Sequence, residues 1–145
     1  MGRCRVALIV AAVLLLPSLL PISTLNAPEW SVCVLDESNR PVGGVLVRES
    51  YQNYSAELEG HEEDLYTDAG GCVSFLPRHV KSSLLKRIVV MLLSATAGGH
   101  ASFGPHSSVT AFRAGQVGDD IRGGLLFVWE GAPTRMRSVL RLRNE

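Results

Sequence analysis

The stretch from Trp30 to Pro77 restricts the possible folds most, because it alternates apolar and polar residues and interrupts that pattern with turn residues. Trp30, Val32 and Val34 fall on one face of an extended chain, which is the pattern of a half-buried β-strand. A polar cluster that contains a proline follows at residues 36–41, and such clusters end strand pairing. The sequence therefore predicts a mainly β fold, whose first strands need further strands to cover their apolar face.

Asp68, Gly70 and Gly71 predict a hairpin turn between two later strands. The aspartate side chain can accept a hydrogen bond from the backbone ahead of it, and the glycines accept positive φ. Beyond the turn, Val73 and Phe75 fall on one face of the next strand. We expect Gly71 to need a positive φ, which other residues adopt at a cost.

Three segments of this stretch resemble the carboxypeptidase regulatory-like family of transthyretin-like β-sandwich domains. The segments are Val34-x-Asp36, Pro41-Val42-x-Gly44-Val45-x-Val47 and Thr67-Asp68-x-x-Gly71-x-Val73-x-Phe75. They cover about a third of the chain and consist of strands and turns, so the resemblance implies a fold more than a function.

The same resemblance also implies a class of function. Domains of this family are mostly appended to exported or outer-surface bacterial proteins, as binding, spacer or stability modules without catalytic residues. A hydroxyisourate hydrolase group with the same fold ends in Tyr-Arg-Gly-Ser. This chain ends in Arg141-Leu142-Arg143-Asn144-Glu145, so that activity is not transferred to it.

The N-terminal residues predict export. Arg3 and Arg5 precede a run of twenty uncharged residues, Val6–Leu25, as in a secretory signal. The sequence at Ala27 is a poor cleavage site, and about 20 apolar residues can also span a bilayer. Residues 1–27 are therefore predicted to be a signal peptide or a signal anchor that holds the chain through residues 6–25. Residues 28–145 are predicted to be one domain, located outside the cytoplasm as a periplasmic, secreted or membrane-anchored module.

The charge balance argues against a nucleic-acid partner. The chain has 14 basic and 14 acidic residues, for a net charge of zero, whereas nucleic-acid-binding domains concentrate positive charge. The pairs Gly98-Gly99 and Gly123-Gly124 belong neither to a Walker pattern nor to a dinucleotide fingerprint,. No cofactor is expected.

Residues 82–96 are predicted to form an amphipathic helix, because apolar residues recur there at helical spacing beside basic ones. The run Ile88–Leu93 is also compatible with a buried strand, since periodicity does not distinguish the two in a short apolar run. A helix here either packs on the sandwich, which is the simpler expectation, or lies on a membrane surface. The apolar residues are Leu84, Leu85, Ile88, Leu92 and Leu93, and the basic ones are Lys81, Lys86 and Arg87.

Short segments bounded by Gly or Pro complete the predicted sandwich. The last of them alternates arginines with Ser138, Leu140 and Leu142. We expect it to be a closing strand whose cationic side chains discourage pairing at a sheet edge. With seven or eight strands in total, the chain has enough for a two-sheet sandwich. The segments are residues 100–103, 107–113, 125–129 and 135–142.

His61, Glu62, Glu63 and Asp64 place four candidate metal ligands next to one another. No second histidine follows in the His-Glu-x-x-His spacing of metalloproteases,. A solvated acidic loop is therefore the preferred interpretation of residues 57–64 over a metal site, because a run of carboxylates is costly to bury.

Cys33 and Cys72 are a candidate disulfide. If Val32 and Val73 face the core on their strands, both cysteines face away from it. The resemblance to transthyretin-like domains implies that the two strands are neighbours in one sheet, and an oxidising compartment would favour the bond. Two unpaired thiols are the alternative, because cross-strand geometry is demanding and one sequence does not fix the register.

Two functions from different classes are consistent with these features. The first is a noncatalytic β-sandwich that binds a protein, glycan or other component of the cell envelope. The second is a small secreted hydrolase or metal-dependent enzyme that uses His61, Glu62 and Glu63, or the region of His100 and His106. No Gly-x-Ser-x-Gly motif is present,. Convergence of those side chains on one pocket would favour the enzyme.

Overall fold

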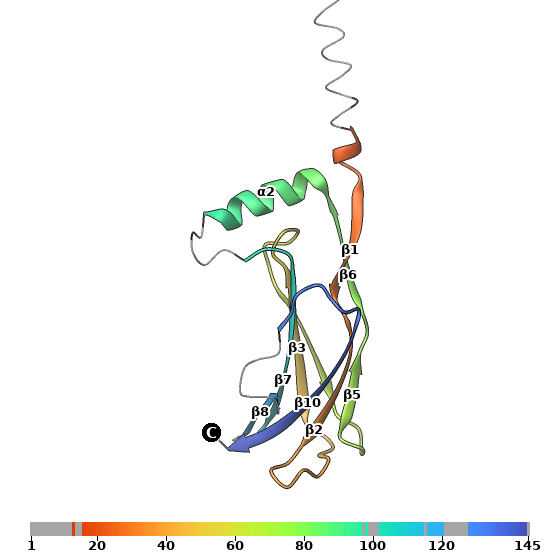
Figure 1. Cartoon of the computed structure of the whole chain (residues 1–145), viewed down its shortest axis with the longest axis vertical. Helices are drawn as coiled ribbons and strands as arrows, with labels where there is room; N and C mark the ends of the chain where they lie inside the picture. The colour runs from red at the N-terminus through yellow and green to blue at the C-terminus, as the bar shows by residue number, and fades with distance from the viewer. Residues whose placement is uncertain are drawn as a thin grey trace, which may run out of the picture.

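The computed structural model describes residues 13, 16–96, 98, 102–114, 116–120 and 128–144. In this part of the chain the fold is mainly β, as predicted, with ten strands and the helix α2 (Figure 1). The elements are β1 Pro21–Ala27, β2 Glu29–Leu35, β3 Leu46–Asn53, β4 His61–Tyr66, β5 Cys72–Phe75, β6 Arg78–Ser83, α2 Leu84–Ala95, β7 Pro105–Arg113, β8 Gln116–Asp120, β9 Val128–Trp129 and β10 Arg135–Asn144.

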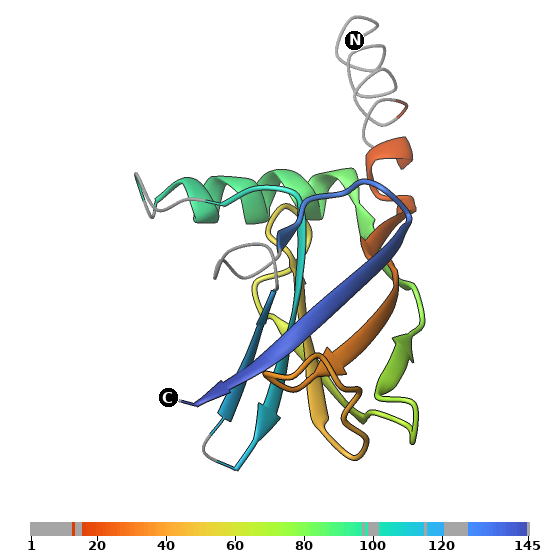
Figure 2. The same ribbon diagram turned by 60° about the horizontal axis from the view of Figure 1, so that its bottom comes forward.

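Most strands belong to one large sheet with the order β4-β3-β7-β8-β10-β2-β5, and β9 pairs with β7 outside this path. Neighbouring strands are antiparallel except β10 and β2, which are parallel. Val47 near one end of the path and Phe75 at the other end belong to the same buried cluster. The sheet therefore bends around a shared core, in a β-sandwich-like arrangement (Figure 2).

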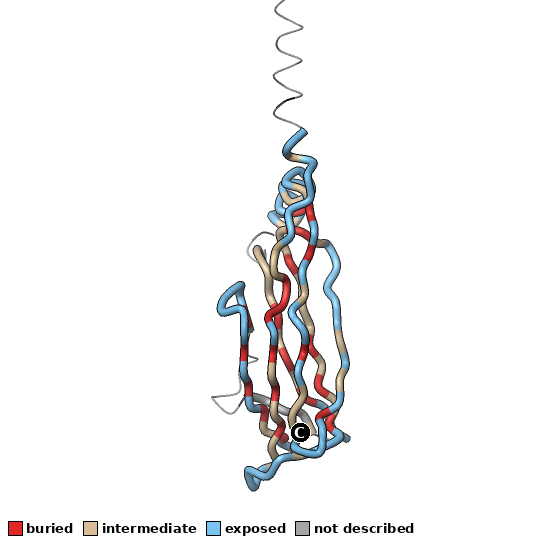
Figure 3. Tube along the Cα trace, turned by 90° about the vertical axis from the view of Figure 1, so that its right-hand side faces the viewer, coloured by how far each residue is buried: buried red, intermediate tan, exposed pale blue. Residues whose placement is uncertain are grey.

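Alternation along the strands builds this core (Figure 3). Trp30, Val32 and Val34 of β2 are buried, as their spacing predicted, while the residues between them are only partly buried. The indole Nε1 of Trp30 donates to Ser138 Oγ at 2.9 Å, so the buried N–H group has a partner. The remaining members of the cluster are Val45, Val47, Phe75, Val109, Ala111, Trp129, Met136, Leu140 and Leu142.

A second, two-stranded sheet pairs β1 with β6. Strand β1 lies within the segment expected to be a leader, and its last residues, Asn26 and Ala27, are buried. Residues 21–27 are therefore part of a sheet, because their backbone pairs with β6, although composition alone assigns them to the apolar leader. The expected N-terminal export helix falls mostly outside the described residues.

Residues 82–96 contain the predicted helix, α2, and the strand alternative for Ile88–Leu93 is wrong. Ser83 caps the helix, because its side chain accepts a hydrogen bond from Lys86 N at 3.2 Å,. α2 crosses one end of the sandwich (Figures 1 and 2). Within the described part of the chain, no helix is long and apolar enough to cross a membrane.

Three expectations about strands differ from the structure. The ten strands exceed the predicted seven or eight because β1, β6 and β8 were not anticipated. Residues 61–64 form part of the edge strand β4, although they were expected in a loop. β10 is internal, between β8 and β2. Its arginines lie on the outer face and do not protect an edge, because the parallel pairing with β2 continues the sheet beyond it.

Candidate functional site

A pocket of about 470 Å³ opens where β4, β3 and β7 lie side by side. The backbone register explains how residues distant in sequence meet there. Tyr51 of β3 lies opposite His61 of β4 and opposite Ser107 of β7, and Gln52 lies opposite His106. The pocket is lined by Ser50, Tyr51, Gln52, Tyr54, Gly60, His61, Glu62, Ser102, His106, Ser107, Ser108 and Val128.

Two tyrosine–histidine pairs shape the pocket. The rings of Tyr51 and His61 are stacked with centroids 5.4 Å apart, and those of Tyr54 and His106 meet edge to face at 5.1 Å. Both distances are within the range of favourable aromatic contacts. The pocket thus presents aromatic surfaces next to groups that form hydrogen bonds.

The acidic residues of β4 point to alternate sides of the sheet, because they lie on a strand. Glu62 and Asp64 both form ion pairs with Arg48, at 2.8 and 2.7 Å. Glu63 pairs with Arg78 of the second sheet at 2.6 Å. The hydrogen bond from Arg48 holds the pKa of Asp64 below its usual range. The three carboxylates of the candidate ligand set are therefore paired with two different arginines, Arg48 and Arg78.

His61 completes that set, and its Nε2 lies 3.1 Å from Glu57 Oε1. Among the described residues, no group of three or more His, Cys, Asp or Glu side chains is placed to hold a metal ion. The less favoured alternative, a metal site at residues 61–64, gains no support there, because strand alternation separates side chains that are adjacent in sequence.

Of the histidines proposed for the alternative enzyme, His106 joins His61 and Glu62 in the pocket. His106 Nε2 lies 3.6 Å from Glu130 Oε1, and its Nδ1 lies 3.4 Å from Gly104 O. His100 lies outside the described residues. The structure therefore brings His106 to the same pocket as the adjacent residues His61 and Glu62.

Glu49 is a buried carboxyl bonded to Ser107, one of the residues that line the pocket. Its side chain is fully buried, and Ser107 Oγ donates to its Oε1 at 3.1 Å. Burial raises the pKa of Glu49 to about 7, and the nearby charge of Glu63 acts in the same direction. Burial also raises the pKa of Tyr51. Two neighbouring residues of β3 therefore favour their neutral forms.

Sequence reasoning missed the part of β3 that forms the pocket wall. Between Tyr51 and Glu63 the sequence is polar and mostly acidic, which predicts a long loop, whereas β3 continues to Asn53. The signal was present in the alternation of Val45, Val47, Glu49 and Tyr51. The carboxylate at the third of these positions obscured it, because charged residues are rarely buried.

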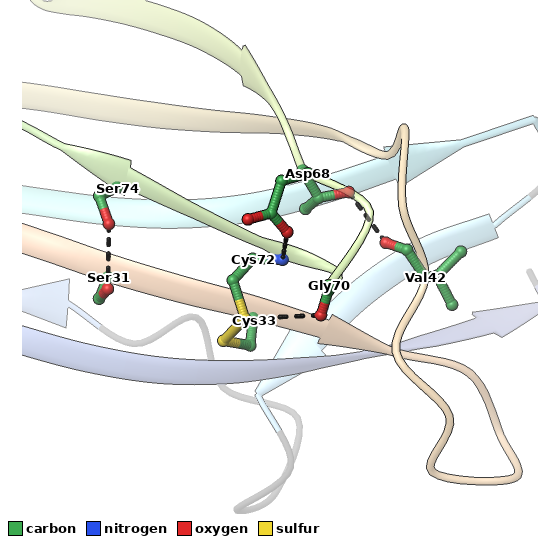
Figure 4. Close-up of a disulfide and its surroundings, with 8 residues drawn as sticks. Ser31, Cys33, Val42, Asp68, Gly70, Cys72 and Ser74 are labelled. Atoms are coloured by element: carbon green, nitrogen blue, oxygen red, sulfur yellow. Dashed lines mark hydrogen bonds between the residues drawn. A yellow bond between two sulfur atoms is a disulfide. The ribbon is translucent and has the colours of Figure 1, made fainter.

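A disulfide joins Cys33 and Cys72, which lie directly opposite each other on β2 and β5 with Cα atoms 4.1 Å apart (Figure 4). The backbone of Cys72 bonds back to the turn, since its N–H donates to Asp68 Oδ1 at 3.0 Å and its C=O accepts from Asp68 N at 2.8 Å. The pair is therefore not hydrogen-bonded across the strands, and such pairs bring side chains closest together.

The turn before Cys72 has the expected backbone conformation. Gly71 has φ +77°. A Cβ atom there would lie 2.8 Å from Val42 N and 2.9 Å from Pro41 Cβ. The position thus needs glycine both for its conformation and for the close approach of the β2–β3 connection.

No protein-family profile matches the chain, and no curated protein sequence matches it. Among solved structures, the chain is similar to 3-chlorocatechol 1,2-dioxygenase from Rhodococcus opacus 1CP. The sequence identity is 13% and the TM-score 0.43, over 85% of this chain and 60% of that chain.

Proposed function

We propose that this chain is an exported, noncatalytic β-sandwich module that binds a glycan of the cell envelope in the pocket beside β3, β4 and β7. The proposal includes membership of the carboxypeptidase regulatory-like, transthyretin-like group of domains. It also includes a location outside the cytoplasm, for which the uncharged run Val6–Leu25 after two arginines is the support,.

The contacts among the three matching sequence segments support the proposed fold group. Val34 N donates to Gly71 O at 2.8 Å, and Val42 N donates to Val34 O at 3.0 Å. Thr67 Oγ1 donates to Val42 O at 2.9 Å and accepts from Val45 N at 3.0 Å. Residues that matched as separate motifs therefore form one hydrogen-bonded unit at one end of the sandwich.

The composition of the pocket wall is the observation on which the glycan proposal depends. Hydroxyl and amide groups of Ser50, Gln52 and Ser108 stand beside the rings of Tyr51 and Tyr54. Hydroxyl-rich ligands need donors and acceptors of this kind, and aromatic rings cover their apolar C–H faces. A pocket that combines hydrogen-bonding groups with aromatic rings fits a short stretch of sugar.

The charged side chains at the pocket support binding over catalysis. Glu62 is bound to Arg48 at 2.8 Å, and His61 to Glu57 at 3.1 Å. A general base must instead reach the proton that it removes from the substrate or nucleophile. Both side chains thus already have partners in the wall of the free protein.

A small hydrolase is the second candidate, because His61, Glu62 and His106 line the same pocket. Two imidazoles and a carboxylate could act as general acid and base if a substrate displaced their present partners. Release of product from a bound glycan or ester would support this candidate over simple binding.

Titration of the full chain with fragments of envelope glycans tests the proposal. We expect saturable binding that Gln52→Ala and Ser108→Ala each weaken by about tenfold, the effect of losing one hydrogen bond worth about 1.4 kcal/mol. Ser74→Ala, on the distant strand β5, is the matched control and should bind normally. Binding that is absent, or equally strong in all three variants, would contradict the proposed site.

Cell fractionation tests the proposed location separately. The chain should be found in the envelope or outside the cell. A full-length chain that stays soluble in the cytoplasm would refute export without bearing on the pocket.

A further inference from the structure

The helix α2 presents its apolar face outward. Its only residues that are not exposed are Arg87, Val90 and Ser94, which are spaced three and four apart and so share one face. Two of these three are polar. The opposite face is formed by Leu85, Ile88, Val89 and Leu92, whose side chains are between 44% and 65% exposed. A helix on the surface of a soluble domain normally has the reverse arrangement.

Hydrogen bonds near both ends of α2 fix this orientation. Arg87 Nη2 donates to Thr24 Oγ1 at 2.9 Å and to Ile22 O at 3.3 Å, both in β1. Ser94 Oγ donates to Tyr54 O at 3.2 Å. Turning the apolar face towards the sandwich would break all three bonds. The outward apolar face is therefore part of the folded arrangement.

The apolar N-terminal segment leaves the sandwich at the same end. Leu16, Leu19, Leu20 and Ile22 are exposed apolar residues, and they lead into or begin β1, which Arg87 joins to α2. Figures 1 and 2 show residues 16–20 and α2 at one end of the sandwich in both views. Two exposed apolar surfaces thus lie side by side.

No linker separates the apolar run from the folded domain. The uncharged run extends from Val6 to Leu25, and β1 begins at Pro21. Cleavage after Ala27 would remove β1 and its contacts with β6. Residues 6–20, the part of the run that precedes β1, are uncharged and can enter a bilayer from this end, although a helix needs about 20 residues to cross one,. The end of the sandwich that bears α2 would then lie directly against the membrane surface.

We propose that α2 lies in the surface of a lipid bilayer, with Leu85, Ile88, Val89 and Leu92 among the acyl chains and the sandwich projecting away. Lys86 is exposed beside this face, and its long side chain can reach the headgroups,. No acidic residue occurs in α2, so anionic lipids are favoured over neutral ones. This inference is independent of the ligand of the pocket.

Depth-dependent fluorescence quenching tests the inference on the full chain. Leu92→Trp places a tryptophan on the outward face, and Tyr66→Trp is the matched control on β4. The exposures of Leu92 and Tyr66 are nearly equal, 65% and 67%. The native Trp30 and Trp129 are buried and contribute equally to both variants. Both variants are reconstituted in vesicles of phosphatidylcholine and phosphatidylglycerol with brominated acyl chains.

We expect the emission of Leu92→Trp to shift to shorter wavelength and to be quenched several-fold more than that of Tyr66→Trp. Adding Leu85→Glu to Leu92→Trp should reduce this quenching. Equal quenching in Leu92→Trp and Tyr66→Trp would overturn the inference. So would a shift without quenching together with cross-linking between copies through α2, since a second copy of the chain would then cover the face. Near-ultraviolet circular dichroism checks that each variant is folded.

Discussion

The two ends of the sandwich orient their apolar side chains in opposite directions. At the turn end, defined by residues 36–45 and 67–72, apolar residues such as Val34 and Val45 point into the core, and turn polar groups bond to one another. At the helix end, defined by β1, β6 and α2, Arg87 and Ser94 point inward and leucines point outward. The first end buries its apolar side chains within the domain, whereas the second leaves apolar side chains exposed to water.

An amphipathic pattern therefore predicts whether a segment is a helix or a strand, but not whether its apolar face points towards the core. Side-chain hydrogen bonds from Arg87 orient α2. In β2, burial of the apolar side chains decides which face points towards the core. Substitutions should therefore have large effects on unfolding at the turn end and small ones on the outer face of the helix end.

Removing the disulfide should have the largest effect. The bond closes a loop with a sequence separation of 39, for which loss of chain entropy predicts about 4 kcal/mol. The double variant Cys33→Ala with Cys72→Ala should lose about this much free energy of unfolding, measured by chemical denaturation. Cys4→Ala is the control and should be unchanged.

Thiol titration gives the same prediction without substitution. The unfolded, unreduced full chain should show a single reactive thiol, that of Cys4. Three reactive thiols in a freshly purified chain would mean that the bond between Cys33 and Cys72 does not form.

A side chain at Gly71 should have the next largest effect. Gly71→Val should cost about 3 kcal/mol, because it adds strain at positive φ to a collision with the backbone at Val42,. Gly44 has a similar φ, +71°, but a Cβ atom there would have no neighbouring atom within 4 Å. Gly44→Val should therefore cost only about 1 to 2 kcal/mol. Thermal melts that show equal losses would mean that the close approach does not matter.

The buried carboxyl of Glu49, which lies between the two ends, should make the free energy of unfolding depend on pH. In the folded state its pKa is about 7, against an ordinary value of 4.5. The folded state thus binds more protons between these values, and stability falls as pH rises through this window. The loss should approach about 3 kcal/mol.

Glu49→Gln should remove this part of the slope when unfolding is measured at pH 5 and pH 8. The exposed Glu37→Gln is the control and should keep the wild-type slope. If the free energy of unfolding changes equally with pH in wild type and Glu49→Gln, the pKa of Glu49 is not raised in the folded protein.

The sequence predicted the turn end well because its signals are local. Gly71 and Asp68 bond within the same turn, and the alternation of Trp30 and Val32 reports burial on one side of a strand. The expectation that the strands of Cys33 and Cys72 are neighbours came from the family resemblance, because periodicity within one strand does not tell which strand lies beside it.

The pocket and the helix end were less predictable because they depend on pairing across the chain. The carboxylates of β4 are accommodated in a strand since Arg48 and Arg78 face them from opposite sides. The orientation of α2 depends on Thr24, sixty-three residues before Arg87. Neither relationship has a local sequence signal.

The smallest effect should come from the outer face of α2. Leu92→Gln should change the free energy of unfolding in mild detergent by less than about 0.5 kcal/mol, because its side chain packs little against the domain. Val90→Ala, two residues away on the inward face, should cost about 1 to 2 kcal/mol, since Val90 is buried,. Chemical denaturation of both variants compares the two faces of one helix directly. A loss at Leu92 as large as that at Val90 would mean that the chain itself covers the outer face, and the contrast between the two ends would no longer hold.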